Sequence, residues 1–144
     1  MGKNVALVLG SGGARGLAHI GAIEALEQRG YTITSIAGCS MGSIIAGMYA
    51  AGQLEEAKEW FLRVDKQLIL RMMDINLLST NSLVKGQKII QELEKIVPDR
   101  PIECLNIQCT IVATDMISAE EVVFRTGSLF EAVRASISIP LFFQ

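Results

Sequence analysis

The chain has 144 residues, of which 50% are hydrophobic and 19% are charged. This length allows one domain with a sizeable hydrophobic core and excludes two domains of ordinary size. Nucleic acid is disfavoured as a partner, because the net charge is -2 at neutral pH and the basic residues form no run.

The N-terminal apolar run is too short for a targeting signal. Residues 5–9 are apolar, but Gly10 ends the run well before the length of a signal peptide or a membrane span. No segment has the basic amphipathic pattern of a membrane anchor, so we expect a cytoplasmic protein whose membrane contacts are transient. The three cysteines, Cys39, Cys104 and Cys109, have no metal-ligand spacing. We therefore expect reduced thiols, and neither a metal nor another cofactor.

Two strand-turn-helix units open the chain. Residues 4–9 form an unbroken apolar run typical of a buried parallel strand, and a glycine-rich loop over 10–16 leads into a helical stripe that closes at Gly30. The β-branched run over 32–38 predicts a second strand, followed by a tight turn and a helix that Gly52 can cap. Successive units of this kind predict a parallel sheet with right-handed crossovers. Both turns then lie at the carboxyl edge of the strands, where open α/β sheets bind ligands.

The rest of the chain adds helices and a hairpin. We expect helices over 54–64 and 86–96, whereas residues 68–82 are apolar without a clean period and are not assigned. A further helix begins after Ser128, with Glu131 at the spacing of a capping box.

Two more strands are predicted in the C-terminal half. They cover residues 107–115 and 120–127 and form a hairpin across 116–119. The last residues, 138–144, are apolar and resemble the interior of a core segment more than a natural terminus.

The glycine loop does not match the two familiar nucleotide motifs. Arg15 stands where a dinucleotide fingerprint needs its third glycine, and no G-x-x-x-x-G-K sequence is present. A run of backbone N–H groups at a helix N-terminus remains, which suits an anion or a developing oxyanion. The same loop would also suit a module that binds a phosphate or an acyl chain without turning it over.

Residues 38–42, Gly-Cys-Ser-Met-Gly, fit the G-x-S-x-G pattern of a nucleophile elbow. The elbow needs residues without a Cβ two positions before and after the nucleophile, and Gly38 and Gly42 meet that need around Ser40. They do not meet it around Cys39, which we interpret as a packing residue. Alone the pattern equally suits a tight turn, but its pairing with the preceding glycine loop favours hydrolytic chemistry.

A base for Ser40 is not evident. His19 is the one histidine, and its apolar neighbours indicate a packing or supporting residue. A Ser-His-Asp triad is therefore unsupported, and a carboxylate could instead take the serine proton directly.

Four blocks of the sequence together resemble the N-terminal part of a bacterial patatin-like phospholipase. They are GSGGARGLAHIGAIEALEQRG, IAGCSMGSIIAGMYAAG, VATD and AVRASISIPLFF, in this order. The resemblance implies a three-layer α/β sandwich with a mainly parallel sheet, incomplete over residues 1–144, and a Ser-Asp dyad acting on lipid esters. It makes Ser40 the nucleophile and places Gly12, Gly13 and Arg15 at the oxyanion hole. Arg15 either steers a phosphate or carboxyl group or solvates the loop.

The acid of the dyad is the main departure from this pattern. The family has its aspartate in a D-G-G or D-G-A motif soon after the SIP segment, and residues up to Gln144 contain no such motif. Asp115 is the best acid within the chain, although its VATD block resembles a structural part of the family. We expect residues 1–144 to be the front part of a longer protein, with little activity alone.

Two alternatives to an enzyme stay open. One is the non-catalytic module that binds a lipid or an anion. The other is a fragment that self-associates, through an exposed sheet edge and the apolar C-terminal end, into a homo-oligomer.

Overall fold

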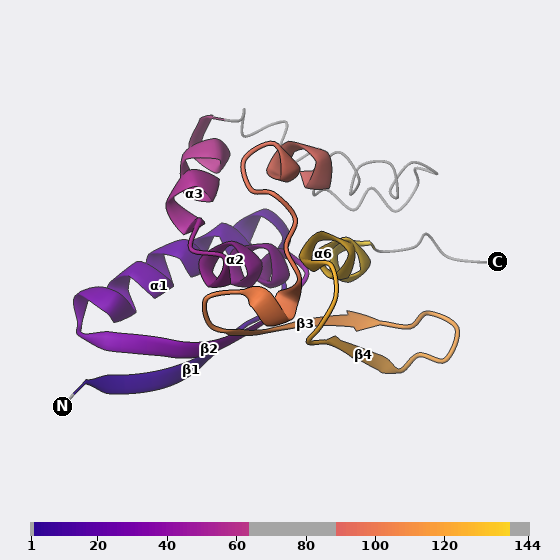
Figure 1. Ribbon diagram of the computed structural model, residues 1–144, viewed down its shortest axis with the longest axis horizontal. Coiled ribbons are helices and arrows are strands. Elements are labelled where there is room, and N and C mark those ends of the chain that lie inside the picture. The colour runs from indigo at the N-terminus through magenta and orange to yellow at the C-terminus, as the bar shows by residue number, and fades with distance from the viewer. Residues whose placement is uncertain (1, 64–88, 139–144) are drawn as a thin grey trace.

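The computed structural model describes residues 2–63 and 89–138 and has a mixed α/β fold (Figure 1). Residues 89–94 are helical. The elements with described bounds are β1 (Lys3–Leu9), the 3-10 turn η1 (Gly13–Leu17), α1 (Ala18–Gln28), β2 (Tyr31–Cys39), α2 (Met41–Ala50), α3 (Leu54–Arg63), the 3-10 turn η2 (Ile102–Cys104), β3 (Gln108–Thr114), β4 (Glu121–Phe124) and α6 (Leu129–Ile137).

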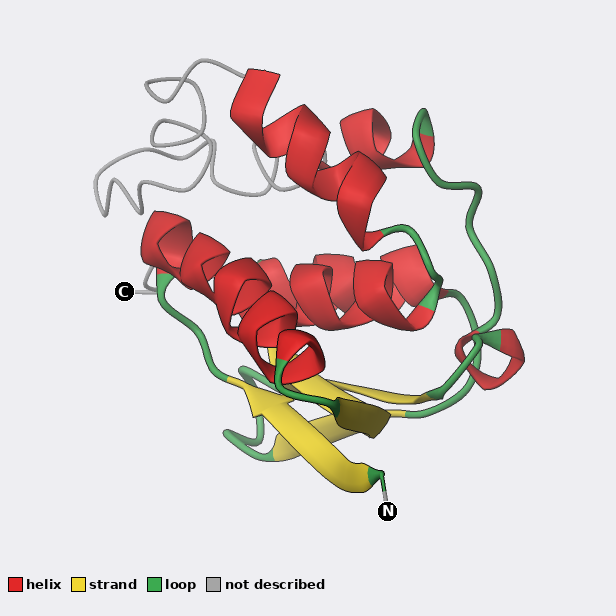
Figure 2. Cartoon of the chain, turned by 90° about the vertical axis from the view of Figure 1, so that its left-hand side faces the viewer, coloured by secondary structure: helices red, strands yellow, loops and turns green. Residues whose placement is uncertain are grey.

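The described strands form one sheet in the order β1-β2-β3-β4. The first three strands are parallel and β4 is antiparallel to β3. Because β1, β2 and β3 follow one another in a single direction across the sheet, right-handed connections place their helices on the same face. Figure 2 shows the helices gathered on one side of the strands. The predicted α/β fold with a mainly parallel sheet is thus confirmed.

The helix α2 lies at the centre of the core. Every residue of α2 except Tyr49 is buried, which explains why its sequence is apolar all round instead of amphipathic. It packs on inward-facing strand residues such as Leu9, Ile36 and Ile111, which are almost completely buried. On the opposite face of the sheet, Val8 on β1 remains 77% exposed. The described residues therefore supply the sheet and the helical layer on one of its faces.

Most observed elements match predicted ones, with two differences. The fourth strand, predicted over 120–127, covers only Glu121–Phe124. The helix expected directly after the glycine loop begins only at Ala18, because residues 13–17 first form the 3-10 turn η1. The unassigned residues 68–82, the first part of the helix predicted at 86–96 and the apolar end from residue 139 lie outside the described residues. No helix in the two described ranges is long and apolar enough to cross a membrane.

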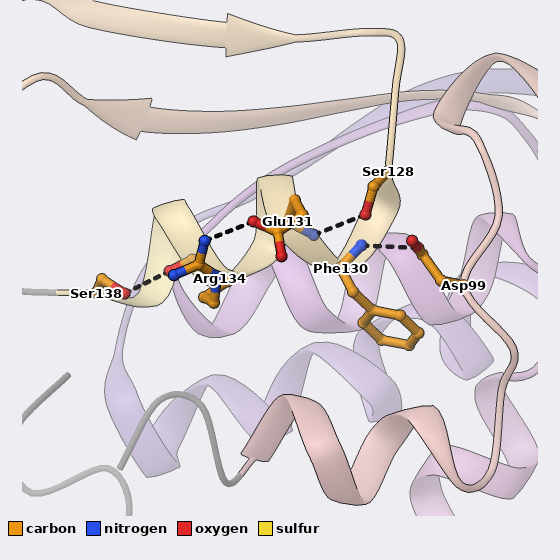
Figure 3. Close-up of polar contacts among 6 residues, drawn as sticks. All are labelled: Asp99, Ser128, Phe130, Glu131, Arg134 and Ser138. Atoms are coloured by element: carbon orange, nitrogen blue, oxygen red, sulfur yellow. Dashed lines mark hydrogen bonds and ion pairs between the residues drawn. The ribbon is translucent and has the colours of Figure 1, made fainter. Parts of the chain in front are cut away.

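The start of α6 confirms half of the predicted capping box (Figure 3). The Ser128 Oγ accepts a hydrogen bond from the Glu131 backbone N–H at 3.0 Å. The Glu131 carboxylate does not reach back to the cap and instead pairs with Arg134 at 2.5 Å. Asp99 supplies a second cap, since its Oδ1 accepts from the Phe130 N–H at 3.1 Å. Two side chains thus fix the N-terminus of α6.

Candidate active site

Ser40 occupies the sharp turn between β2 and α2 with a strained backbone. Its φ of 53° and ψ of -122° lie in a region that residues with a side chain rarely adopt. Ala119 is the one other described non-glycine residue with positive φ. Such a conformation costs about 1–3 kcal/mol and persists only where the surrounding structure enforces it. Ser40 thus lies on a sharp, strained strand-to-helix turn.

The two glycines that flank Ser40 are required by close backbone contact. A Cβ on Gly38 would lie 2.2 Å from the Gly42 carbonyl oxygen, and a Cβ on Gly42 would lie 2.2 Å from that of Leu9. The same Gly42 Cβ would approach the Gly10 oxygen to 2.6 Å. Hence α2 can begin this close to β1 and β2 only because both positions lack a side chain.

The glycine loop after β1 has a different character. Gly12 has a φ of 132° and Gly13 a φ of 54°, so the backbone there takes conformations open to glycine. The Arg15 N–H donates to the Gly12 carbonyl at 3.1 Å and closes the turn, while the Arg15 side chain is exposed. Gly16 then abuts the elbow, since a Cβ there would lie 2.4 Å from Cγ of Met41. The structure thus packs the glycine loop directly against the start of α2.

Register places both turns at one edge of the sheet, as the sequence predicted. Leu9, the last residue of β1, pairs with Gly38 in β2. The loop from Gly10 and the elbow at Ser40 therefore leave the sheet side by side. The positive end of α2 also points at Ser40, which favours negative charge on that residue.

Both polar backbone groups of Ser40 are held by other serines. The Ser40 carbonyl accepts from the Ser43 hydroxyl at 2.6 Å and from the Ser43 N–H at 2.9 Å. The Ser40 N–H donates to the Ser136 Oγ at 2.8 Å. Sequence reasoning missed both residues. One signal was available for Ser136: it falls seven residues after Leu129, on the buried stripe of α6, where an apolar residue is expected.

His19 supports the glycine loop. Its Nε2 lies 2.9 Å from the Gly10 carbonyl oxygen. A carbonyl only accepts hydrogen bonds, so this contact assigns a proton to Nε2 and leaves that atom unable to act as a base. This placement agrees with the supporting role expected for His19.

The structure does not join Asp115 to the elbow. Asp115 follows β3 and is exposed, and its Oδ1 accepts from the N–H groups of Ile117 at 2.8 Å and Ser118 at 3.4 Å. These contacts shape the turn between β3 and β4. The carboxylate thus serves the hairpin in the described part of the chain.

The groups with clearly shifted pKa lie away from the elbow. Burial raises the pKa of the Cys109 thiol on β3 to about 11. Burial, together with the hydrogen bond to Glu27, raises the pKa of the Tyr49 hydroxyl near the other end of α2 to about 12. Neither group can supply a proton acceptor to Ser40 at neutral pH.

These features define a class of protein: an α/β domain whose first two strand-to-helix turns form a glycine loop and a serine elbow. The family model for patatin-like phospholipases matches residues 7–144, so the chain belongs to the patatin-like phospholipase family.

Similar proteins come from bacteria and animals. An NTE family protein of Mycobacterium tuberculosis is 47% identical over 136 residues, which cover 94% of this chain and 38% of that protein. The human patatin-like phospholipase domain-containing protein 6 is 33% identical over 143 residues, covering 96% of this chain and 10% of the relative. The neuropathy target esterase sws of Drosophila persimilis is 30% identical over a similar span. The chain therefore spans well under half the length of these relatives.

Proposed function

We propose that the protein is a serine acyl hydrolase of lipid and phospholipid esters, with Ser40 as its nucleophile. Membership of the patatin-like phospholipase family implies lipid ester hydrolysis as the general activity. The observation that carries the assignment to Ser40 is its strained backbone, at a φ of 53°, between two glycines in backbone contact. Strain of this kind concentrates at functional sites, because a loop without such a role would relax.

The proposed reaction is a two-step acyl transfer. The Ser40 Oγ attacks the ester carbonyl carbon, forming a tetrahedral intermediate whose oxygen carries the negative charge. The N–H groups of Gly12 and Gly13, with Arg15 nearby, hold that oxygen. The carbon–oxygen bond to the alcohol then breaks and the alcohol leaves with a proton. Water hydrolyses the acyl-serine, releasing the acid. Loss of one oxyanion donor is worth about 2.7–4 kcal/mol in such reactions.

Arg15 has two candidate roles, one in the oxyanion hole and one in steering an anionic group, and its geometry favours the second. Its backbone N–H is used within the turn, donating to Gly12 at 3.1 Å. The side chain is exposed at the mouth of the loop, which favours steering of an anionic phosphate over a role inside the oxyanion hole.

The proton acceptor for Ser40 is proposed to lie outside the described residues. The aspartates within them are Asp99 and Asp115. Asp99 caps α6 through the Phe130 N–H, and Asp115 holds the β3–β4 turn. Because its carboxylate is engaged in this turn, Asp115 is a weaker candidate for the proton acceptor than an aspartate outside the described residues. We propose that residues 1–144 alone turn over little substrate.

Location and partners follow as proposals from the sequence. We infer a cytoplasmic protein that meets membranes transiently to reach its lipid substrate. The alternative for the isolated chain is self-association through an exposed sheet edge and the apolar C-terminal end. Light scattering of residues 1–144 that shows only monomer would remove it.

The test is hydrolysis of a phospholipid and of a short p-nitrophenyl ester by the full-length protein and three variants. Ser40→Ala is expected to abolish turnover. Asp115→Asn keeps an oxygen able to hold the turn, so it is expected to retain near-normal activity, and residues 1–144 alone are expected to be almost inactive. Lipid binding without turnover by the full-length protein would instead favour the non-catalytic module.

A further inference from the structure

Ser136 joins three segments that are far apart in the sequence. It lies on α6, is only 9% exposed, and is one of two buried polar residues in the described core. Its Oγ accepts from the Ser40 N–H at 2.8 Å and donates to the Val112 carbonyl of β3 at 2.6 Å. One hydroxyl therefore links the elbow, the neighbouring strand and the helix behind them.

The direction of these hydrogen bonds is fixed by the donors available. The Val112 carbonyl can only accept, so it takes the single hydroxyl proton of Ser136. The Ser40 N–H can only donate, and it meets a lone pair on the same oxygen. If Ser136 loses its hydroxyl, both the Ser40 N–H and the Val112 carbonyl lose a partner in a partly buried position.

The second serine contact at the elbow is local by comparison. The Ser43 hydroxyl binds the Ser40 carbonyl within the first turn of α2. Ser40 is the N-cap of α2 and Ser43 lies in its first turn, so this contact moves with α2 and cannot set the orientation of the elbow relative to the sheet. Ser136 can, because Val112 is the register partner of Cys39, the residue just before Ser40.

The position of Ser136 is itself held firmly. The N-terminus of α6 is capped by Ser128 and Asp99 (Figure 3), and the Leu129 N–H donates to the Arg100 carbonyl at 3.1 Å. Ser136 follows two helical turns later, on the buried face of the helix. The hydroxyl thus has a rigid support.

We propose that Ser136 is a positioning residue for Ser40: by holding the Ser40 N–H against β3 it aims the Ser40 hydroxyl at the substrate carbonyl. This inference rests on the proposed function. It also occupies the Ser40 N–H, so that this group is not free to bind the oxyanion. Small displacements of a reacting group lower kcat more than they change substrate binding.

The experiment compares kcat and KM of the full-length protein for a short p-nitrophenyl ester with those of three variants. Ser136→Ala is expected to lower kcat about 10- to 100-fold with KM changed less than about 2-fold. Ser136→Thr keeps the hydroxyl and is expected to restore most of kcat. The matched control is Ser138→Ala. Within the described residues the Ser138 hydroxyl donates to the Arg134 carbonyl of α6 and makes no hydrogen bond with the elbow, so this variant is expected to leave kcat unchanged.

Circular dichroism and the melting temperature separate positioning from folding. A folded Ser136→Ala variant with wild-type kcat, even at a lower melting temperature, would overturn the proposal. If Ser136→Ala does not fold, the nearly isosteric Ser136→Cys decides: kcat lowered at least about 5-fold supports the proposal, and wild-type kcat contradicts it. If the full-length Ser40→Ala variant is as active as the wild type, the proposed function itself is overturned, whatever the result for the Ser136 variants.

Discussion

The glycine loop after β1 and the elbow after β2 both depend on glycine, but for different physical reasons. At the elbow, Gly38 and Gly42 are needed because a Cβ would lie 2.2 Å from a carbonyl oxygen. In the loop, a Cβ on Gly10 or Gly13 would meet nothing within 4 Å, and it is the positive φ of Gly12 and Gly13 that needs glycine. The two glycines of the elbow are thus required by packing, whereas Gly12 and Gly13 are required by backbone conformation. A tightly packed turn suits a nucleophile that must be held in place, and a glycine-rich loop suits a set of backbone N–H donors.

Substitution of Gly42 should have the largest effect on stability. Gly42→Ala forces a methyl group against the oxygens of Leu9 and Gly10, so we expect the free energy of unfolding to fall by about 3 kcal/mol or more. Gly10→Ala is the matched control in the other turn and should change it by less than about 0.5 kcal/mol. Urea unfolding of both variants measures the difference, and equal losses would remove the distinction between the two turns.

Substitution of Gly12 should lower stability less than substitution of Gly42, because it strains the backbone without a severe clash. Gly12→Ala places a side chain at a φ of 132°, where the nearest atom is 3.3 Å away, so we expect a loss of about 1–3 kcal/mol without a severe clash. Gly21 in the exposed part of α1 also has open space, but its φ is not positive. Gly21→Ala should stabilise by about 0.5–1 kcal/mol, and a similar gain for Gly12→Ala would contradict the conformational explanation.

The strain at Ser40 should appear as a gain in stability when it is relieved. Glycine tolerates a φ of 53°, whereas alanine keeps the Cβ. We therefore expect the free energy of unfolding of Ser40→Gly to be about 1 kcal/mol higher than that of Ser40→Ala. Both variants lack the hydroxyl, so the comparison isolates the backbone. Identical melting temperatures would show that the elbow stores no strain.

Cysteine reactivity should be the mildest probe, and it reports how well β3 is covered. Burial raises the pKa of the Cys109 thiol to about 11, so the unreactive protonated form prevails at every pH well below that value. Cys104 is exposed. Alkylation of the folded protein at pH 8 should modify Cys104 first and Cys109 only after unfolding, as peptide mass spectrometry would show. Rapid modification of Cys109 would mean that β3 is poorly covered.

Much of this arrangement was readable from the sequence, because it depends on local patterns. The glycines around Ser40, the Ser128 cap and the strand-turn-helix order each follow from short-range steric or hydrogen-bonding rules. Residue-level partners were not readable. Arg134 stands three residues after Glu131, a spacing that favours an ion pair on a helix, but the sequence does not decide between that pair and the capping box.

The contact between Ser136 and Ser40 shows the same limit more clearly. It joins residues 96 positions apart. Only the pairing of β2 with β3 and the packing of α6 on β3 bring the Ser40 nitrogen within 2.8 Å of the Ser136 Oγ. The sequence marks Ser136 as a polar residue on a buried stripe but does not identify its partner. His19 likewise stands among apolar neighbours, and its bond to Gly10 depends on how α1 returns over β1.

The most direct test of the central claim is covalent labelling of the full-length protein with a fluorophosphonate probe. Labelling requires an activated nucleophile, so a binding module would not react. We expect a single phosphonyl adduct on Ser40, located by peptide mass spectrometry and lost in Ser40→Ala. An adduct on another serine, or labelling of Ser40→Ala at the wild-type rate, would contradict the assignment of Ser40 as the nucleophile.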